Sequence, residues 1–343
     1  MEMNSIERIL CVLERGVPDR VPHFEWMVDV KVREALCPQA ITPQEFYDRM
    51  DWDAVIADTS YNKVKVGDNR WRSEWGFVLQ DTQEEHGVEV ESPIKTLADF
   101  KRYSPPDPHA PGRFKNIEDA IEKYGGHRAV IVHLNDVFTL PRYLMGMQDL
   151  LKAIIQEPRL VRSLVEMSVD VNLALAREVA ARGIKVVYTG DDYAYNRGPL
   201  MSPGHFKELF YPGLKRAIQG FKDLDLYVIK HSDGNLWPIL DMIIDSGIDC
   251  LDPIDPLGGM DLAEVKAKYG HRVALKGNVD CAHLLSFGTP DQVRTATREA
   301  LRKGMPGGGF ILSSSNSIHS AVLPENYAAL LETWKEHGIY PQV

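Results

Sequence analysis

The sequence predicts an α/β fold, a (β/α)₈ TIM barrel that forms a single domain over residues 1–343. Two observations predict it. From about residue 129 onward, short apolar runs alternate with longer segments of helical periodicity. In addition, eight such runs occur in the whole chain, and nearly all end in polar residues, as the strands of such barrels do where they carry an active site.

The chain opens with a predicted helical extension, because MEMNSIERILCVLERG places apolar residues at helical spacing. Eight strands are expected after it. Their ranges are 21–26, 54–59, 129–134, 185–190, 226–230, 248–251, 273–276 and 309–312. The last six are apolar on both faces, as parallel strands covered by helices should be.

Helical periodicity predicts helices over 158–181, 203–221, 237–246, 261–269, 290–303 and 324–337. Several begin with a proline, such as Pro203, Pro290 and Pro324, and proline is well tolerated in a first helical turn. An open doubly wound sheet is the alternative architecture. No GxGxxG or GxxxxGK[ST] phosphate loop follows any of the strands to support it.

Residues 70–93 interrupt the alternation and are predicted to form an inserted hairpin, with Gly76 and Gly87 near its turns. The proline-rich stretch 103–111 reads as a rigid linker from this insertion to the third strand. It is no domain boundary, because two strands are expected before it.

Composition excludes several classes of partner. The formal net charge of −10 makes nucleic acid and anionic membranes poor partners. The four cysteines lie far apart and form no CxxC pair, which argues against disulfides and a thiolate zinc site, and favours the cytoplasm. No run of about 18 apolar residues suggests a membrane-spanning helix. The sequence leaves a homo-oligomer open.

Polar side chains at the strand ends are the candidates for chemistry. They are Glu25, Asp58, His133, Asn135, Asp136, Asp191, Asp192, His231, Asp233, Asp252, Asp255, Asn278, Asp280, Asn316 and His319. Strand-end aspartates often cap the next helix, and we assign Asp255 and Asp280 that role first. His133 could equally be a hydrogen-bonded core histidine.

The sharpest local signal is HSDGN, in which His231 and Asp233 lie two residues apart at a strand end. Imidazole and carboxylate at this spacing form a candidate metal half-site suited to zinc. In the alternative interpretation, Asp233 only orients the ring of His231. Asp191 and Asp192 are the next candidates for ligand or general acid, because one of two adjacent carboxylates tends to keep a proton.

Four separated segments carry a family resemblance: the TGDD turn, the HSDGN turn, KGNVDCAHLLSFGTPDQVR and GGGFILSSSNSIHSAVLPENYAALLETWKEHG. Together they resemble the uroporphyrinogen decarboxylase superfamily over almost the whole chain. True decarboxylases of that family carry an arginine-rich segment after the first strand. Here the region reads HFEWMVDVKVRE, and Glu25 and Asp29 would repel a tetrapyrrole that bears many carboxylates.

The chain looks more like the corrinoid-dependent methyltransferase branch, whose members move a methyl group to or from the cobalt of a separate corrinoid protein. In the thiol-using members an H-x-C pair and a later cysteine hold zinc. His231 matches the histidine, whereas Asp233 and Asn316 stand where cysteines would be expected. The resemblance therefore implies a corrinoid partner, with zinc as the candidate metal in an altered site.

Oxygen ligands suit the leaving oxygen of a methyl ether, so we expect a demethylating methyltransferase that acts on a small methoxylated or similar substrate. His231, Asp233, Asp191 and Asp192 would be catalytic. The pocket would be lined by Glu25, Asp58, His133, Tyr193, Asn278, Asn316 and His319. Aromatic stacking could come from Trp26, Tyr61, Tyr193 and Tyr195.

Two other functions remain open, a divergent decarboxylase or lyase of the same fold and a binding protein without catalysis. A decarboxylase predicts clustered arginines at the mouth of the barrel, where only Arg142 and Arg197 are placed for that role. A non-catalytic binder would not need the histidine and carboxylates of the fourth and fifth strands.

Overall fold

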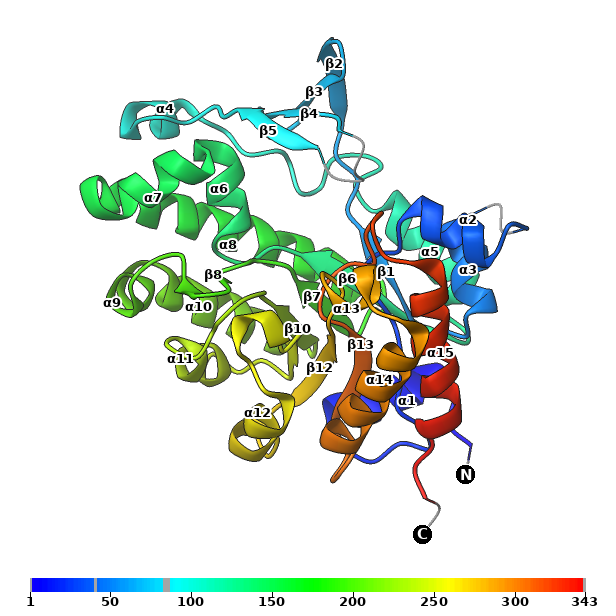
Figure 1. The fold of residues 1–343 in the computed structure, drawn as a ribbon. Coiled ribbons are helices and arrows are strands. Elements are labelled where there is room, and N and C mark those ends of the chain that lie inside the picture. Colours follow the sequence, from blue (N-terminus) through cyan, green and yellow to red (C-terminus); the bar gives the residue numbers. More distant parts are fainter. Residues whose placement is uncertain (1, 40–41, 83–86, 342–343) are drawn as a thin grey trace.

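The computed structural model describes residues 2–39, 42–82 and 87–341. Seven parallel strands form one sheet in the order β1-β6-β7-β10-β11-β12-β13 (Figure 1). Their bounds are β1 Ala54–Asp58, β6 Ala129–Leu134, β7 Val186–Thr189, β10 Tyr227–His231, β11 Cys250–Asp252, β12 Ala274–Val279 and β13 Phe310–Ser314. Each was predicted to within three residues. The carboxyl ends of these strands meet at one edge of the sheet, which is where the site lies.

The first predicted strand, residues 21–26, is wrong as a strand. The structure has one isolated β-bridge there, the parallel bridge between His23 and Leu312. Pro22 lacks an N–H group and interrupts a regular ladder. The segment nevertheless contacts both edges of the sheet, because Pro22 accepts from Leu312 N at 3.0 Å and His23 accepts from Asp53 N at 2.9 Å. We call residues 21–24 the edge segment.

Helices follow most strands and cover the outer face of the sheet (Figure 1). Their bounds are α5 Lys115–Tyr124, α6 Thr139–Met145, α7 Met147–Gln156, α8 Pro158–Ala181, α9 Pro203–His205, α10 Tyr211–Lys222, α11 Leu240–Asp245, α12 Leu262–Tyr269, α13 Leu284–Phe287, α14 Pro290–Gly304 and α15 Pro324–His337. A π-helical turn, Phe206–Phe210, joins α9 to α10 and completes the predicted helix at 203–221. Helices α8 and α15 have the predicted bounds.

The expected helical extension is present as α1 Ser5–Leu13, and α2 Val30–Leu36 and α3 Pro43–Arg49 follow it. Asn4 and Thr42 begin α1 and α3 with capping boxes, in which the cap and the third helical residue satisfy each other's backbone N–H groups. Among the described residues, no helix is long and apolar enough to cross a membrane.

The predicted inserted hairpin is larger than expected. It is a four-stranded antiparallel sheet, β2 Lys63–Gly67, β3 Arg70–Ser73, β4 Val78–Gln80 and β5 Val88–Glu91, followed by α4 Leu97–Arg102. Residues 83–86, within the predicted hairpin, lie outside the described residues. Figure 1 shows this small sheet apart from the seven-stranded sheet, at the top of the molecule. Its first strand escaped prediction because Lys63–Gly67 is exposed and lacks an apolar run.

Candidate active site

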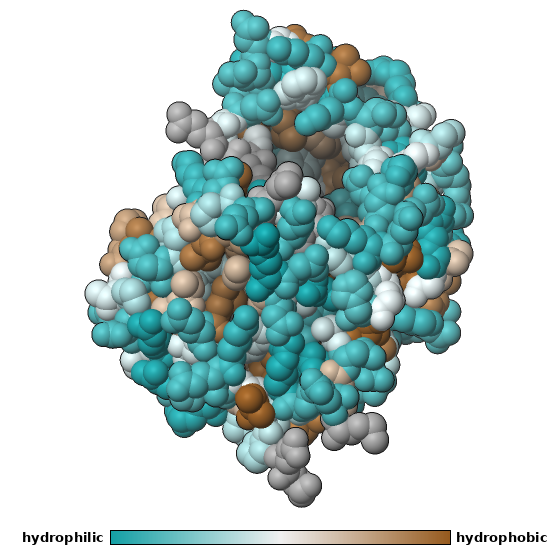
Figure 2. All heavy atoms as spheres, turned by 90° about the vertical axis from the view of Figure 1, so that its right-hand side faces the viewer, coloured by the Kyte–Doolittle hydropathy of each residue, from teal (hydrophilic) through white to brown (hydrophobic). Residues whose placement is uncertain are grey.

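A cavity of about 730 Å³ lies where the carboxyl ends of β1, β6, β7 and β10 face the small sheet. Figure 2 shows a hollow below the upper lobe, with apolar side chains in its wall. The aromatic side chains that line the cavity are Trp26, Tyr61, Trp75, Phe77, Phe138, Tyr143 and Tyr188. Its carboxylates are Asp58, Asp192 and Asp233, and its imidazoles are His133 and His231. A cavity of this size and mixed polarity suits a small organic ligand.

His231, the last residue of β10, is held by its neighbours at one ring nitrogen. Its Nδ1 lies 2.6 Å from Oδ2 of Asp252 and 2.9 Å from the hydroxyl of Tyr188, which itself donates to Asp252. Contacts of this kind fix the orientation of the ring. They leave Nε2 to face the cavity.

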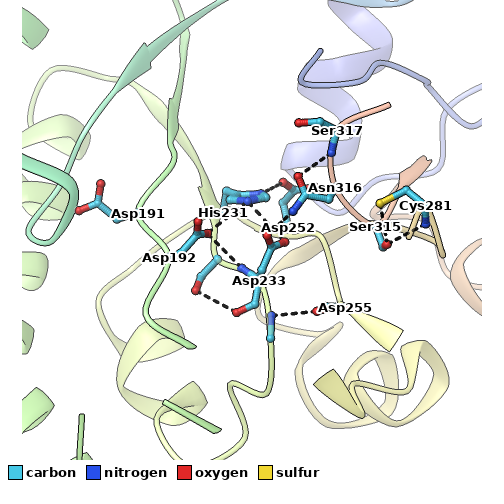
Figure 3. A network of polar contacts seen from close by, with 12 residues as sticks. Asp191, Asp192, His231, Asp233, Asp252, Asp255, Cys281, Ser315, Asn316 and Ser317 are labelled. Carbon is cyan, nitrogen blue, oxygen red and sulfur yellow. Dashed lines mark hydrogen bonds and ion pairs between the residues drawn. The ribbon is translucent and has the colours of Figure 1, made fainter. Parts of the chain in front are cut away.

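Two carboxylates face that free nitrogen. Nε2 of His231 lies 3.4 Å from Asp192 Oδ1 and 3.6 Å from Asp233 Oδ1 (Figure 3). Asn316 donates to the other oxygen of Asp233, so the four side chains form one cluster. Oδ1 of Asp233 is buried and forms no hydrogen bond within the described part of the chain.

The electrostatics of this cluster favour a positive charge at its centre. Burial alone lowers the pKa of His231, but the charge of Asp233 and the hydrogen bond with Asp252 outweigh burial and raise the pKa to about 9. Burial raises the pKa of Asp233 to about 7, although the charge of His231 opposes that rise. The cluster can therefore take up a proton or a cation.

The three donor groups fit a zinc ion. Asp192, His231 and Asp233 each offer an atom within 4.8 Å of the others. Tetrahedral ligands about 2.0 Å from zinc stand about 3.3 Å apart, close to the 3.4 and 3.6 Å separations from Nε2. If these three residues held zinc, a fourth position would remain for a substrate atom, as in catalytic zinc sites.

Asp252 supports His231 from below and is itself paired. Its Oδ1 lies 2.8 Å from the buried Nζ of Lys276, which also donates to Ser313 at 3.0 Å. Burial would raise the pKa of Asp252, but the charge of Lys276 and the hydrogen bond with His231 outweigh it and hold that pKa well below its ordinary value. Asp252 therefore stays ionised and keeps Nδ1 of His231 protonated.

The structure separates Asp191 from this cluster, and Figure 3 shows its carboxylate directed away from His231. Asp191 is fully buried, and its Oδ2 accepts from the backbone N–H groups of Phe138 and Thr139 at the start of α6. Its neighbour Asp136 pairs with the buried Lys230 at 3.0 Å. This environment fits support of α6 rather than contact with a ligand.

The other predicted pocket residues divide into two groups. Asp58, His133 and Asn316 line the cavity, whereas Glu25, Tyr193, Asn278 and His319 do not. The second group bonds within the protein: Glu25 accepts from Ser314, Tyr193 donates to Asp136, Asn278 donates to Ile254 O, and His319 accepts from Ala321 N. Asp255 caps the 3-10 turn Pro256–Gly258, as predicted.

Several residues that shape the site carried no clear sequence signal. Tyr188 and Lys276 lie inside strands that were predicted from their apolar residues, and Asp252 was one of many polar strand ends. A lysine in an otherwise apolar strand is a usable signal in retrospect, because a buried ammonium group requires a buried partner. Trp75, Phe77 and Tyr143 reach the cavity only through the arrangement of the small sheet and α6.

Comparison with known proteins places this architecture in a family. The sequence model described as "Uroporphyrinogen decarboxylase (URO-D)" matches residues 79–337. The uroporphyrinogen decarboxylase of Psychromonas ingrahamii is 26% identical over 261 residues, which cover 71% of this chain and 69% of that protein. The methylated-thiol–coenzyme M methyltransferase of Methanosarcina mazei is 23% identical over 223 residues, 65% of this chain and 57% of that protein.

Among solved structures, a methyltransferase from Methanosarcina mazei matches with a TM-score of 0.73 and 19% identity, over 98% of this chain and 99% of that one. At this identity the match shows the shared fold. This chain is an α/β protein whose parallel strands present polar side chains at their carboxyl ends, an arrangement that is typical of enzymes. Within that class, this chain belongs to the uroporphyrinogen decarboxylase superfamily.

Proposed function

We propose that this protein is a corrinoid-dependent methyltransferase that moves a methyl group from a small methoxylated aromatic substrate to the cobalt of a separate corrinoid protein. The observation that carries the proposal is the cluster of Asp192, His231 and Asp233 at the wall of an aromatic cavity. The fold shared with a methyltransferase supports it.

In this proposal Asp192, His231 and Asp233 hold zinc, which when bound supplies positive charge that draws electrons from the ether oxygen of the substrate. Asp252 and Tyr188 keep the ring of His231 in place. The aromatic walls bind the ring of the substrate, and the small sheet limits access of water.

The donor set favours an oxygen rather than a sulfur leaving group. A thiolate-rich site suits a zinc that activates sulfur, whereas carboxylates make a harder site. Asp233 and Asn316 stand together here, joined by a hydrogen bond, at the positions where the resemblance implies cysteines. We therefore propose a methyl ether as the methyl donor.

The charge of the cavity disfavours a tetrapyrrole decarboxylase. Among the described residues, its lining has the three carboxylates of Asp58, Asp192 and Asp233 but only two side chains that are always cationic, Lys63 and Arg142. A substrate with many carboxylates would meet repulsion at the cluster. Arg197, the second arginine that a decarboxylase was expected to use, does not line this cavity.

The test is a spectroscopic methylation assay. The zinc-loaded protein is mixed with a reduced Co(I) corrinoid protein and with methoxylated aromatics, methylamines or methyl thiols, and methylation is followed by the absorbance of the corrinoid. We expect methylation with the aromatic ethers, and its loss in His231→Ala with an unchanged circular dichroism spectrum. Release of CO2 from carboxylated substrates, without any methylation, would support the lyase instead.

A further inference from the structure

A second imidazole–carboxylate pair faces the cavity. It takes no part in the cluster of Asp192, His231 and Asp233, which we call the zinc cluster. His133, near the end of β6, places its Nδ1 2.8 Å from Oδ1 of Asp58 at the end of β1. Both side chains line the cavity, and that of Asp58 is 58% exposed. The pair is therefore accessible to a ligand.

The rings of Trp26 and Tyr188 lie between the imidazoles of His133 and His231, and we call these two rings the aromatic floor. Register pairs place Asp58, His133 and Tyr188 side by side on β1, β6 and β7. The ring of Trp26 contacts that of His133 edge-on at 4.5 Å and stacks on Tyr188 at 4.9 Å. His231 lies on the next strand, β10, so the strands that carry the two imidazoles are two strand spacings, about 10 Å, apart.

The hydrogen bond with Asp58 defines the chemistry of the free nitrogen of His133. Nδ1–H of His133 donates to the Asp58 carboxylate, and this hydrogen bond favours the tautomer in which Nε2 is the acceptor. No hydrogen bond to Nε2 forms within the described residues. Gly190 lies beside this nitrogen, and a Cβ at that position would stand 3.0 Å from it. Glycine thus keeps space open beside the acceptor.

Resting on the function proposed above, we propose that His133, oriented by Asp58, determines specificity by accepting a hydrogen bond from a hydroxyl group on the substrate ring. A ligand that spans the floor places its methyl ether at the zinc cluster and its hydroxyl at His133. The substrate class is then a methoxyphenol, in preference to an aromatic ether without a free hydroxyl.

The test compares two ligands of similar shape by isothermal titration calorimetry of the zinc-loaded full chain without a corrinoid protein. We expect 4-methoxyphenol to bind about five- to tenfold more tightly than 1,4-dimethoxybenzene, the effect of one neutral hydrogen bond. His133→Phe should remove the preference and keep the affinity for the dimethoxy compound, whereas His133→Gln, which retains an acceptor, should restore part of it. Equal affinities in the unchanged protein, or a preference that survives in His133→Phe, would overturn the proposal.

Two further variants test whether the preference depends on access to Nε2 of His133 and not on the loss of any imidazole. Gly190→Ala keeps the imidazole but crowds Nε2, and should reduce the same preference. His109→Phe removes an imidazole that lies 3.3 Å from Glu178 outside the cavity, and should change nothing. The titration contains no corrinoid, so the two proposals can fail separately. If the protein prefers 4-methoxyphenol but methylates no corrinoid in the earlier assay, only the methyltransferase proposal is rejected. Methylation without the preference would reject only the role of His133.

Discussion

Asp191 and Asp192 are neighbours in the chain with opposite environments. Asp191 is buried against the start of α6, whereas the side chain of Asp192 is 52% exposed and faces His231. Burial raises the pKa of Asp191, but the hydrogen bond with Asp136 and the charge of Lys230 outweigh it and lower that pKa. A buried ionised group with such partners stabilises the fold.

We therefore predict opposite phenotypes for two adjacent substitutions. Asp191→Ala should lower the free energy of unfolding by about 2–4 kcal/mol, because it leaves buried polar partners unpaired. Asp192→Ala should change it by less than about 0.5 kcal/mol but weaken zinc binding. Urea unfolding and zinc titration of both variants check this. Zinc binding that is lost in Asp191→Ala and kept in Asp192→Ala would reverse the assignment.

Asp252 should tune zinc affinity without touching the metal. It holds Nδ1 of His231, and carboxylates in this position raise the basicity of the ligand nitrogen. Asp252→Asn should therefore weaken zinc binding about 10- to 100-fold, measured by competition with a chromophoric chelator. Asp280→Asn, which alters a carboxylate that accepts loop N–H groups and lies 3.7 Å from Nδ1 of His283, is the matched control. Unchanged affinity in Asp252→Asn would contradict the support assigned to it.

At the scale of elements, prediction from sequence succeeded where one pattern dominated. The strand β6, whose apolar run is broken only by His133, and the proline-initiated α8 and α15 were predicted with their bounds. The small sheet was predicted only as a hairpin, because most of its strand residues face solvent and its strands are short.

The candidate site was predictable only in part. The HSDGN turn identified His231 and Asp233 from local spacing alone. Which of two adjacent aspartates joins them depends on how the chain leaves β7, and Asp252 reaches His231 only through the pairing of β10 with β11. Such pairings between strands are invisible in one sequence. For the same reason Glu25 and Tyr193 were placed in the pocket although they bond within the protein.

At the scale of the whole molecule, stability should fall in mild acid because of His23. Burial holds the pKa of His23 at about 3, far below its ordinary 6.5, with Nδ1 donating to Leu312 O at 2.9 Å. Between these two pH values the unfolded chain binds a proton that the folded chain does not. Stability is therefore lost as the pH falls below 6.5, by up to about 1.4 kcal/mol per pH unit from this one residue.

The substitution His23→Asn checks this prediction, because asparagine does not titrate and can still donate and accept hydrogen bonds. Unfolding free energies measured by urea titration at pH 7, 6 and 5 should fall less steeply in the variant than in the unchanged protein. Parallel pH profiles would show that His23 contributes no linked proton.

The edge segment has a consequence for solubility. β1 and β13 end the seven-stranded sheet, and uncovered edges of a sheet offer rows of free N–H and C=O groups to other molecules. Residues 21–24 occupy those groups with few hydrogen bonds, so this cover is a candidate for local opening. A molecule in which the edge segment detaches exposes the unpaired backbone groups of β1 and β13 while most of its core stays folded. The route from native protein to aggregate is then expected to begin at the edge segment.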